Sequence, residues 1–151
     1  MARYRFLTTW ILEAPIERVW DVLYDAARWP EWWRGVIRTE VLDGGSLWRT
    51  TWRSRLPYEL DFEFEILETA RPHFLLGRAR GELAGEGRWR LFEHEGLTAS
   101  TWDWEVETTA AWMKALRPVA KPVFAWNHHW VMRRGAEGLA RELGARLVAA
   151  T

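Results

Sequence analysis

The chain has 151 residues, 48% of them hydrophobic and 28% charged, which is the composition of one globular domain spanning residues 1–151. Its 21 basic residues balance 21 acidic ones, and this argues against long-range attraction to nucleic acid or an anionic membrane. The absence of cysteine excludes disulfides, thiol catalysis and cysteine-ligated metal. No apolar run approaches the ~20 residues of a membrane span and no signal-peptide core follows Met1, so we expect a cytoplasmic protein without integral membrane association.

Two helices are predicted directly after the first strand. Residues 4–12 alternate with period two, as a half-buried strand does. Pro15 then stands where a first helical residue would be, a position at which its missing N–H costs nothing. The apolar residues at helical spacing after it are Ile16, Val19, Trp20, Leu23 and Ala27. Pro30 begins a short second helix that carries Trp32 and Trp33.

The middle of the chain predicts a mostly antiparallel sheet, because short turns separate its strands. With residues 4–12 included we expect seven strands, the others being residues 36–42, 47–56, 58–68, 74–80, 87–93 and 97–108. In residues 58–68 aromatic and aliphatic side chains point one way and four carboxylates the other. That pattern predicts one apolar inner face and one solvated outer face with cross-strand ion pairs.

The C-terminal part of the chain is predicted to be helical. Residues 110–116 form one short candidate helix, and a long helix follows it to about Val148. The apolar stripe assigned to the long helix consists of Pro122, Ala125, His129, Met132, Ala136, Leu139, Leu143 and Leu147. Gly135, Gly138 and Gly144 each lower helix propensity by about 1 kcal/mol relative to alanine, so either close packing explains them or the helix bends.

This element order and three sequence segments resemble the START-related or SRPBCC superfamily. Residues 14–20 (Ala-Pro-Ile-Glu-Arg-Val-Trp) and residues 29–33 (Trp-Pro-Glu-Trp-Trp) are similar to its entry and turn motifs. Residues 87–106 are similar to its bacterial polyketide cyclase/dehydrase-like branch. The resemblance implies an α+β helix-grip fold, in which a curved antiparallel sheet wraps around the long C-terminal helix and encloses a cavity for an apolar ligand. These motifs seat helices and carry no chemistry of their own.

His129 is the candidate catalytic residue. It lies within the predicted apolar stripe, where an imidazole can bind a ligand oxygen or move a proton. The alternative is a core histidine satisfied by a neighbouring group. His128 falls about 100° around the helix and is expected to be exposed. Adjacent helical residues diverge and no i+4 partner is present, so we expect no metal site at this pair. No glycine-rich phosphate loop follows a strand, and we expect no cofactor.

Charged residues offer two further candidates. Arg133 could pair with a ligand carboxylate or enolate, or else reach the helix edge to pair with a carboxylate of the sheet. Asp103, Glu105 and Glu107 share one strand face. We expect them in an outer row partnered by Arg88 and Arg90, although a register shift of one residue would turn them inward.

Thirteen tryptophans could fill the core, line a pocket or form its lip. The favoured hypothesis is binding of an apolar aromatic, polyketide-like or lipid molecule between the sheet and the long helix. One alternative is a cyclase or dehydratase that uses His129 as general acid/base, and another is a partner-binding domain whose cavity is plugged by tryptophan. The predicted ligand-binding residues are Phe6, Thr8, Trp10, Thr50, Trp52, Phe62, Trp126, Trp130, Met132 and Arg133.

Overall fold

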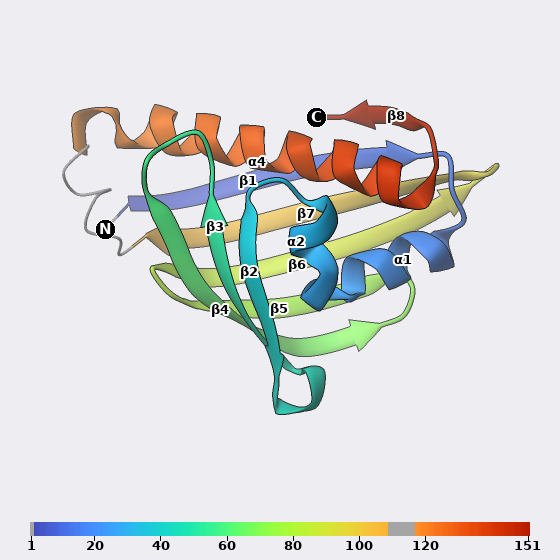
Figure 1. The fold of residues 1–151 in the computed structure, drawn as a ribbon, viewed down its shortest axis with the longest axis horizontal. Coiled ribbons are helices and arrows are strands. Elements are labelled where there is room, and N and C mark those ends of the chain that lie inside the picture. The colour runs from blue at the N-terminus through green and yellow to red at the C-terminus, as the bar shows by residue number, and fades with distance from the viewer. Residues whose placement is uncertain (1, 109–116) are drawn as a thin grey trace.

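A strongly curved antiparallel sheet holds a long helix against its concave face in the computed structural model, which describes residues 2–108 and 117–151 (Figure 1). The eight strands lie in the order β2-β3-β4-β5-β6-β7-β1-β8. Their bounds are β1 Ala2–Leu12, β2 Val36–Leu42, β3 Leu47–Arg53, β4 Glu59–Ala70, β5 Phe74–Gly81, β6 Leu83–His94, β7 Leu97–Thr108 and β8 Leu147–Ala150. The helices are α1 Ile16–Tyr24, α2 Trp29–Trp32 and α4 Ala120–Leu143, with single 3-10 turns at Ala26–Arg28, Asp43–Gly45 and Arg117–Val119.

Helix α1 packs its predicted apolar face on the sheet. Ile16, Val19, Trp20 and Leu23 are buried as their spacing indicates. Pro15 is the N-cap and has no side-chain cap, so a carboxylate oxygen of Glu93 in β6 accepts the hydrogen bond from the Ile16 N–H at 2.9 Å. The helix ends at Tyr24, before Ala27 of the predicted stripe, and α2 follows at Trp29.

The sheet has the predicted two-sided pattern. Trp102 and Val106 of β7 face the interior, whereas Asp103, Glu105 and Glu107 form an outer row. Their predicted partners were wrong, because β1 and not β6 supplies the paired arginines. The Arg5 and Arg3 guanidinium groups lie 3.6 and 3.0 Å from the carboxylates of Asp103 and Glu107, while Arg88 pairs with Glu86 and Arg90 lies over the Phe74 ring.

Two glycines of α4 allow a close approach between this helix and α2. A Cβ atom at Gly138 would overlap the Trp32 carbonyl oxygen, and one at Gly135 would overlap the Trp33 indole. Trp33 also donates a hydrogen bond from its indole N–H to the Val131 carbonyl at 2.9 Å. Close packing, and not bending, therefore explains Gly135 and Gly138.

The C-terminal end of α4 differs from the prediction. Gly144 adopts the left-handed conformation (φ 62°), and the Ala145 N–H closes the helix end by donating to the Ala140 carbonyl at 2.9 Å. The predicted helical stretch to Val148 was therefore wrong, because this cap turns the chain back into β8. That strand pairs with β1 and makes the sheet one strand larger than the predicted seven. The predicted helix at residues 110–116 lies outside the described residues.

Within the described part of the chain, no helix has the length and apolarity needed to cross a bilayer. No group of three histidine, aspartate or glutamate side chains in residues 2–108 and 117–151 lies close enough together to hold a metal ion.

Gly138→Ala should destabilise the protein by roughly 2–3 kcal/mol, because the added methyl group meets backbone that cannot yield locally. Urea unfolding measures the change. Gly144→Ala is the control, since nothing lies within 4 Å of its added methyl group and only backbone strain of about 1 kcal/mol opposes it. An unchanged or raised stability of Gly138→Ala, as helix propensity alone would give, would contradict the close-packing account.

Candidate functional site

Tryptophans fill one part of the space between the sheet and α4. We define the tryptophan cluster as Trp10, Trp29, Trp33, Trp48, Trp89 and Trp102, each at most 4% exposed. Neighbouring rings contact one another with centroids 4.4 Å apart for Trp89 and Trp102 and 5.5 Å apart for Trp10 and Trp33. Their orientations are tilted or edge-on, which suits the charge distribution of aromatic rings. Core filling is therefore the role of most tryptophans of this chain that the structure describes.

A cavity lies beside this cluster, beneath the first half of α4. Its volume is about 80 Å³, and it opens to solvent. The lining comes from β1, β3, β4, β6, β7, α4 and the β3–β4 loop. It consists of Phe6, Trp52, Arg53, Ser54, Leu56, Tyr58, Leu60, Phe62, Leu83, Trp104, Val106, Phe124, Asn127, His128, Val131 and Met132.

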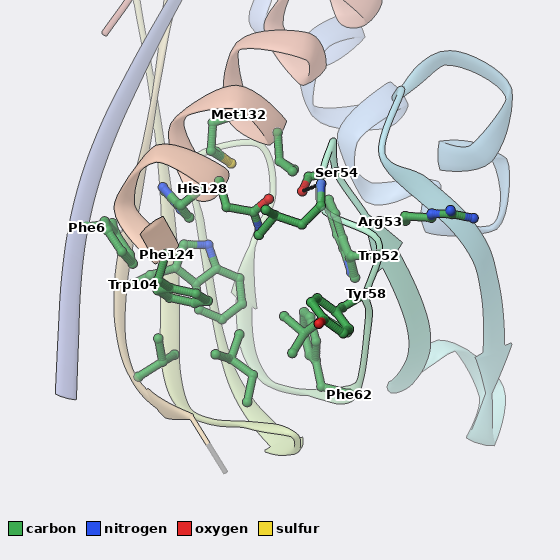
Figure 2. Close-up of a pocket in the computed structure, with 16 residues that line it drawn as sticks. Phe6, Trp52, Arg53, Ser54, Tyr58, Phe62, Trp104, Phe124, His128 and Met132 are labelled. Atoms are coloured by element: carbon green, nitrogen blue, oxygen red, sulfur yellow. Dashed lines mark hydrogen bonds between the residues drawn. The ribbon is translucent and has the colours of Figure 1, made fainter. Parts of the chain in front are cut away.

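Aromatic side chains bound the cavity on two opposite sides (Figure 2). Phe6, Trp104 and Phe124 lie on one side, and Trp52 and Phe62 lie on the other with their rings stacked at an interplanar angle of 10°. The Arg53 side chain is directed away from the cavity. No carboxylate stands among the described lining residues.

His128 and Asn127 of α4 are the polar residues under the helix. The His128 imidazole stacks on Phe6, with ring centroids 4.0 Å apart. Its Nε2 atom and the Asn127 Oδ1 atom are buried and have no hydrogen-bond partner among the described residues. Burial, together with the neighbouring His129, lowers the pKa of His128 to about 4. This imidazole is therefore uncharged at neutral pH.

The structure places four predicted ligand-binding residues at the cavity, namely Phe6, Trp52, Phe62 and Met132. Thr50 is buried and does not line the cavity. Trp130 is half-buried near the Gly35 turn, with the Arg134 guanidinium over its ring. Trp126 is 47% exposed and does not line the cavity. A separate hollow of about 10 Å³, the space of one water molecule, lies between β1, α4 and β8. Its lining consists of Thr8, Trp10, His129, Met132, Arg133, Ala150 and Thr151.

The predicted orientation of the two histidines was wrong. His129 is exposed, and its neighbour His128 lines the cavity. The second half of the predicted stripe is confirmed, because Met132, Ala136, Leu139 and Leu143 are buried. Its first half was wrong, since Pro122, Ala125 and His129 are exposed while Phe124 and Val131 are buried. Arg133 is largely exposed and pairs with Glu137 at 3.5 Å. The catalytic role of His129 stays an untested prediction, and the imidazole available to a guest in the cavity belongs to His128.

Sequence reasoning also missed the other cavity residues of α4 and the β3–β4 loop. Phe124 and His128 have the i, i+4 spacing of one helical face, which could have revealed them. Ser54, Leu56 and Tyr58 reach the cavity because the chain leaves β3 at Arg53, three residues before the predicted end of that strand. No sequence pattern marks that contact.

Comparisons with known proteins agree with this architecture. The solved structures that resemble the chain include the Zhui aromatase/cyclase from a Streptomyces species. It shows 17% identity over 95% of this chain and 94% of its own, with a TM-score of 0.78. The di-domain ARO/CYC protein BexL shows 20% identity over 95% of this chain and 51% of its own, with a TM-score of 0.76. A START superfamily protein from Mycobacterium smegmatis shows 15% identity over 93% of this chain and 97% of its own, with a TM-score of 0.75. At these identities the likeness concerns the fold.

A comparison with curated proteins gave no significant match. The family model described as "Polyketide cyclase / dehydrase and lipid transport" matches residues 5–144, which include nearly all of the sheet and the whole of α4. The helix-grip fold expected from the sequence resemblance is confirmed. The chain therefore belongs to the polyketide cyclase/dehydrase and lipid transport family.

Proposed function

We propose that this protein binds a neutral, apolar aromatic molecule in the cavity between the sheet and α4. The observation that carries the proposal is the lining itself, which is apolar on nearly all sides and contains several aromatic rings. Ligand sites of this kind are concave and apolar with few polar groups. The family membership and the fold of the aromatase/cyclase neighbours support the same conclusion.

The charge of the cavity favours a neutral guest. Its described lining holds no carboxylate, the Arg53 guanidinium points away, and His128 is uncharged at neutral pH. A charged guest would lose its hydration without gaining an opposite charge, and that loss is costly in an apolar site. A guest hydroxyl or carbonyl group could instead pair with the polar edge that His128 and Asn127 provide beneath α4.

The low pKa of His128 favours binding as the function of the cavity over acid–base catalysis by this residue. A group with a pKa of about 4 is a weak base at neutral pH, whereas an efficient general base has a pKa near the working pH. The cyclase/dehydratase hypothesis would also need a second proton-transfer group, for which the described lining offers the Tyr58 and Ser54 hydroxyls but no carboxylate. The plugged-cavity hypothesis accounts for the tryptophan cluster but not for the open space next to it.

The expected affinity is modest. A buried aromatic ring system removes about 150–250 Å² from water, which at about 25 cal/mol per Å² amounts to a gross gain of about 4–6 kcal/mol. Association costs reduce this gain. Calorimetric titration at millimolar ligand concentration is therefore the suitable measurement.

The protein should bind 4-ethylphenol in an isothermal titration, and Leu60→Trp should weaken binding at least about tenfold because the larger side chain fills the cavity. Leu7→Trp is the matched control, since Leu7 is 70% exposed on the outer face of β1. This variant should bind the phenol as tightly as the wild type does. Absence of binding to the folded wild type, or equal binding by Leu60→Trp, would refute the cavity as the binding site.

His128 should make stability depend on pH. Its folded pKa of about 4 lies below the ordinary 6.5, so the unfolded chain binds more protons between these values. The stabilisation is thus complete above pH 6.5 and decreases as the pH falls towards 4. From pH 7 to 4.5, the free energy of unfolding should fall by roughly 2 kcal/mol more in the wild type than in His128→Leu.

Urea unfolding at the two pH values measures this difference. His94→Leu serves as the control because the His94 side chain is 87% exposed at the end of β6, and this variant should keep the pH dependence of the wild type. An equal loss of unfolding free energy on acidification in His128→Leu and the wild type would contradict the conclusion that His128 is buried and uncharged.

A further inference from the structure

We propose that Trp52 is a fixed end wall that limits the cavity to guests with a single aromatic ring. The inference rests on the proposed function and adds to it the size class of the ligand and the residue that sets this class. Trp52 lies where the cavity meets the tryptophan cluster, so its indole separates open space from filled space.

Several contacts hold the Trp52 indole in place. Its N–H donates a hydrogen bond to the Thr50 Oγ1 atom at 2.8 Å, and the Thr50 hydroxyl donates in turn to the Phe62 carbonyl at 3.2 Å. Thr50 is only 2% exposed, so this anchor is shielded from water. The indole also stacks on Phe62, whose ring lies at an interplanar angle of 10°. A side chain fixed by both a buried hydrogen bond and a ring stack presents a rigid wall.

The space behind Trp52 is closed. The Trp33 ring meets the Trp52 indole edge-on with centroids 4.9 Å apart, and Trp29 lies at 6.0 Å. Trp33 itself is held by its hydrogen bond to the Val131 carbonyl. Displacing Trp52 inward would require moving the close-packed junction of α2 and α4. A longer guest therefore cannot gain depth by pushing the wall back.

The volume of the cavity sets the size of the guest. An apolar cavity of about 150 Å³ in another protein holds one benzene molecule, whereas the cavity here measures about 80 Å³. A single ring thus already uses the space inside and part of the mouth. The mouth is formed on one side by the β3–β4 loop, where Tyr58 is 47% exposed. A fused second ring would have to remain in solvent or collide with Trp52.

Removing the indole should lengthen the cavity by about the depth of one ring. Trp52 lies on the inner face of β3, and Trp33 behind it would close the enlarged space. The test uses two ligands that differ by one fused ring, 4-ethylphenol and 6-ethyl-2-naphthol, titrated calorimetrically into the wild type and Trp52→Ala. Trp126→Ala is the control, because Trp126 is exposed and does not line the cavity.

We expect the wild type and Trp126→Ala to bind the phenol about tenfold or more tightly than the naphthol, and Trp52→Ala to reverse this preference. Naphthol binding to the wild type as tight as phenol binding would overturn the inference and leave the proposed function intact. If neither ligand bound the wild type, the proposed function itself would fail, and the inference with it.

Trp52→Leu provides a second variant if Trp52→Ala does not fold, because leucine still covers part of Trp33. It should relax the preference at least about threefold towards the naphthol. A folded Trp52→Leu with an unchanged ratio of the two dissociation constants would show that another residue limits the guest. The ratio of the phenol and naphthol dissociation constants is measured for the wild type whether or not the variants fold. The size limit of the cavity is therefore testable without any variant.

Discussion

The close contact between α2 and α4 determines how the interior of this protein is divided. Bulky tryptophans at the end of α2 lie directly under a helix that has no side chains at Gly135 and Gly138. The hydrogen bond from Trp33 to the Val131 carbonyl fixes the same junction. Protein interiors pack at high density and transmit steric strain, so this contact sets the position of the whole helix. The first half of α4 is held by rings further out, where His128 stacks on Phe6.

Two regions with different roles result from this arrangement. Next to the glycines, tilted and edge-on indoles fill the space and supply burial, the dominant favourable term in folding. Towards the start of α4, the same layer remains partly empty and is bounded by aromatic walls. Trp52 belongs to both regions, because it contacts Trp33 on one side and the cavity on the other. The tryptophans of this protein therefore both fill the core and bound the cavity.

The sequence predicted the features that depend on local periodicity. Alternation in β4 and β7 correctly indicated the inner face, and the stripe through Ile16 and Leu23 indicated the buried side of α1. The stripe predicted the buried side of the second half of α4, but not of the first half, because Ala125 and Trp126 give its solvent side an apolar character as well. Contacts with α2, which is distant in sequence, determine which of the two apolar faces of α4 is buried. For this reason the cavity histidine was assigned to His129 instead of His128, and the tryptophans that line the cavity were not separable from those that fill the core.

Diffraction from crystals under xenon pressure would test the division of the interior most directly, because xenon enters dry apolar cavities of sufficient size. The account predicts xenon in the cavity under Met132 and none within the tryptophan cluster. Xenon among the indoles, or a cavity region without xenon, would contradict it.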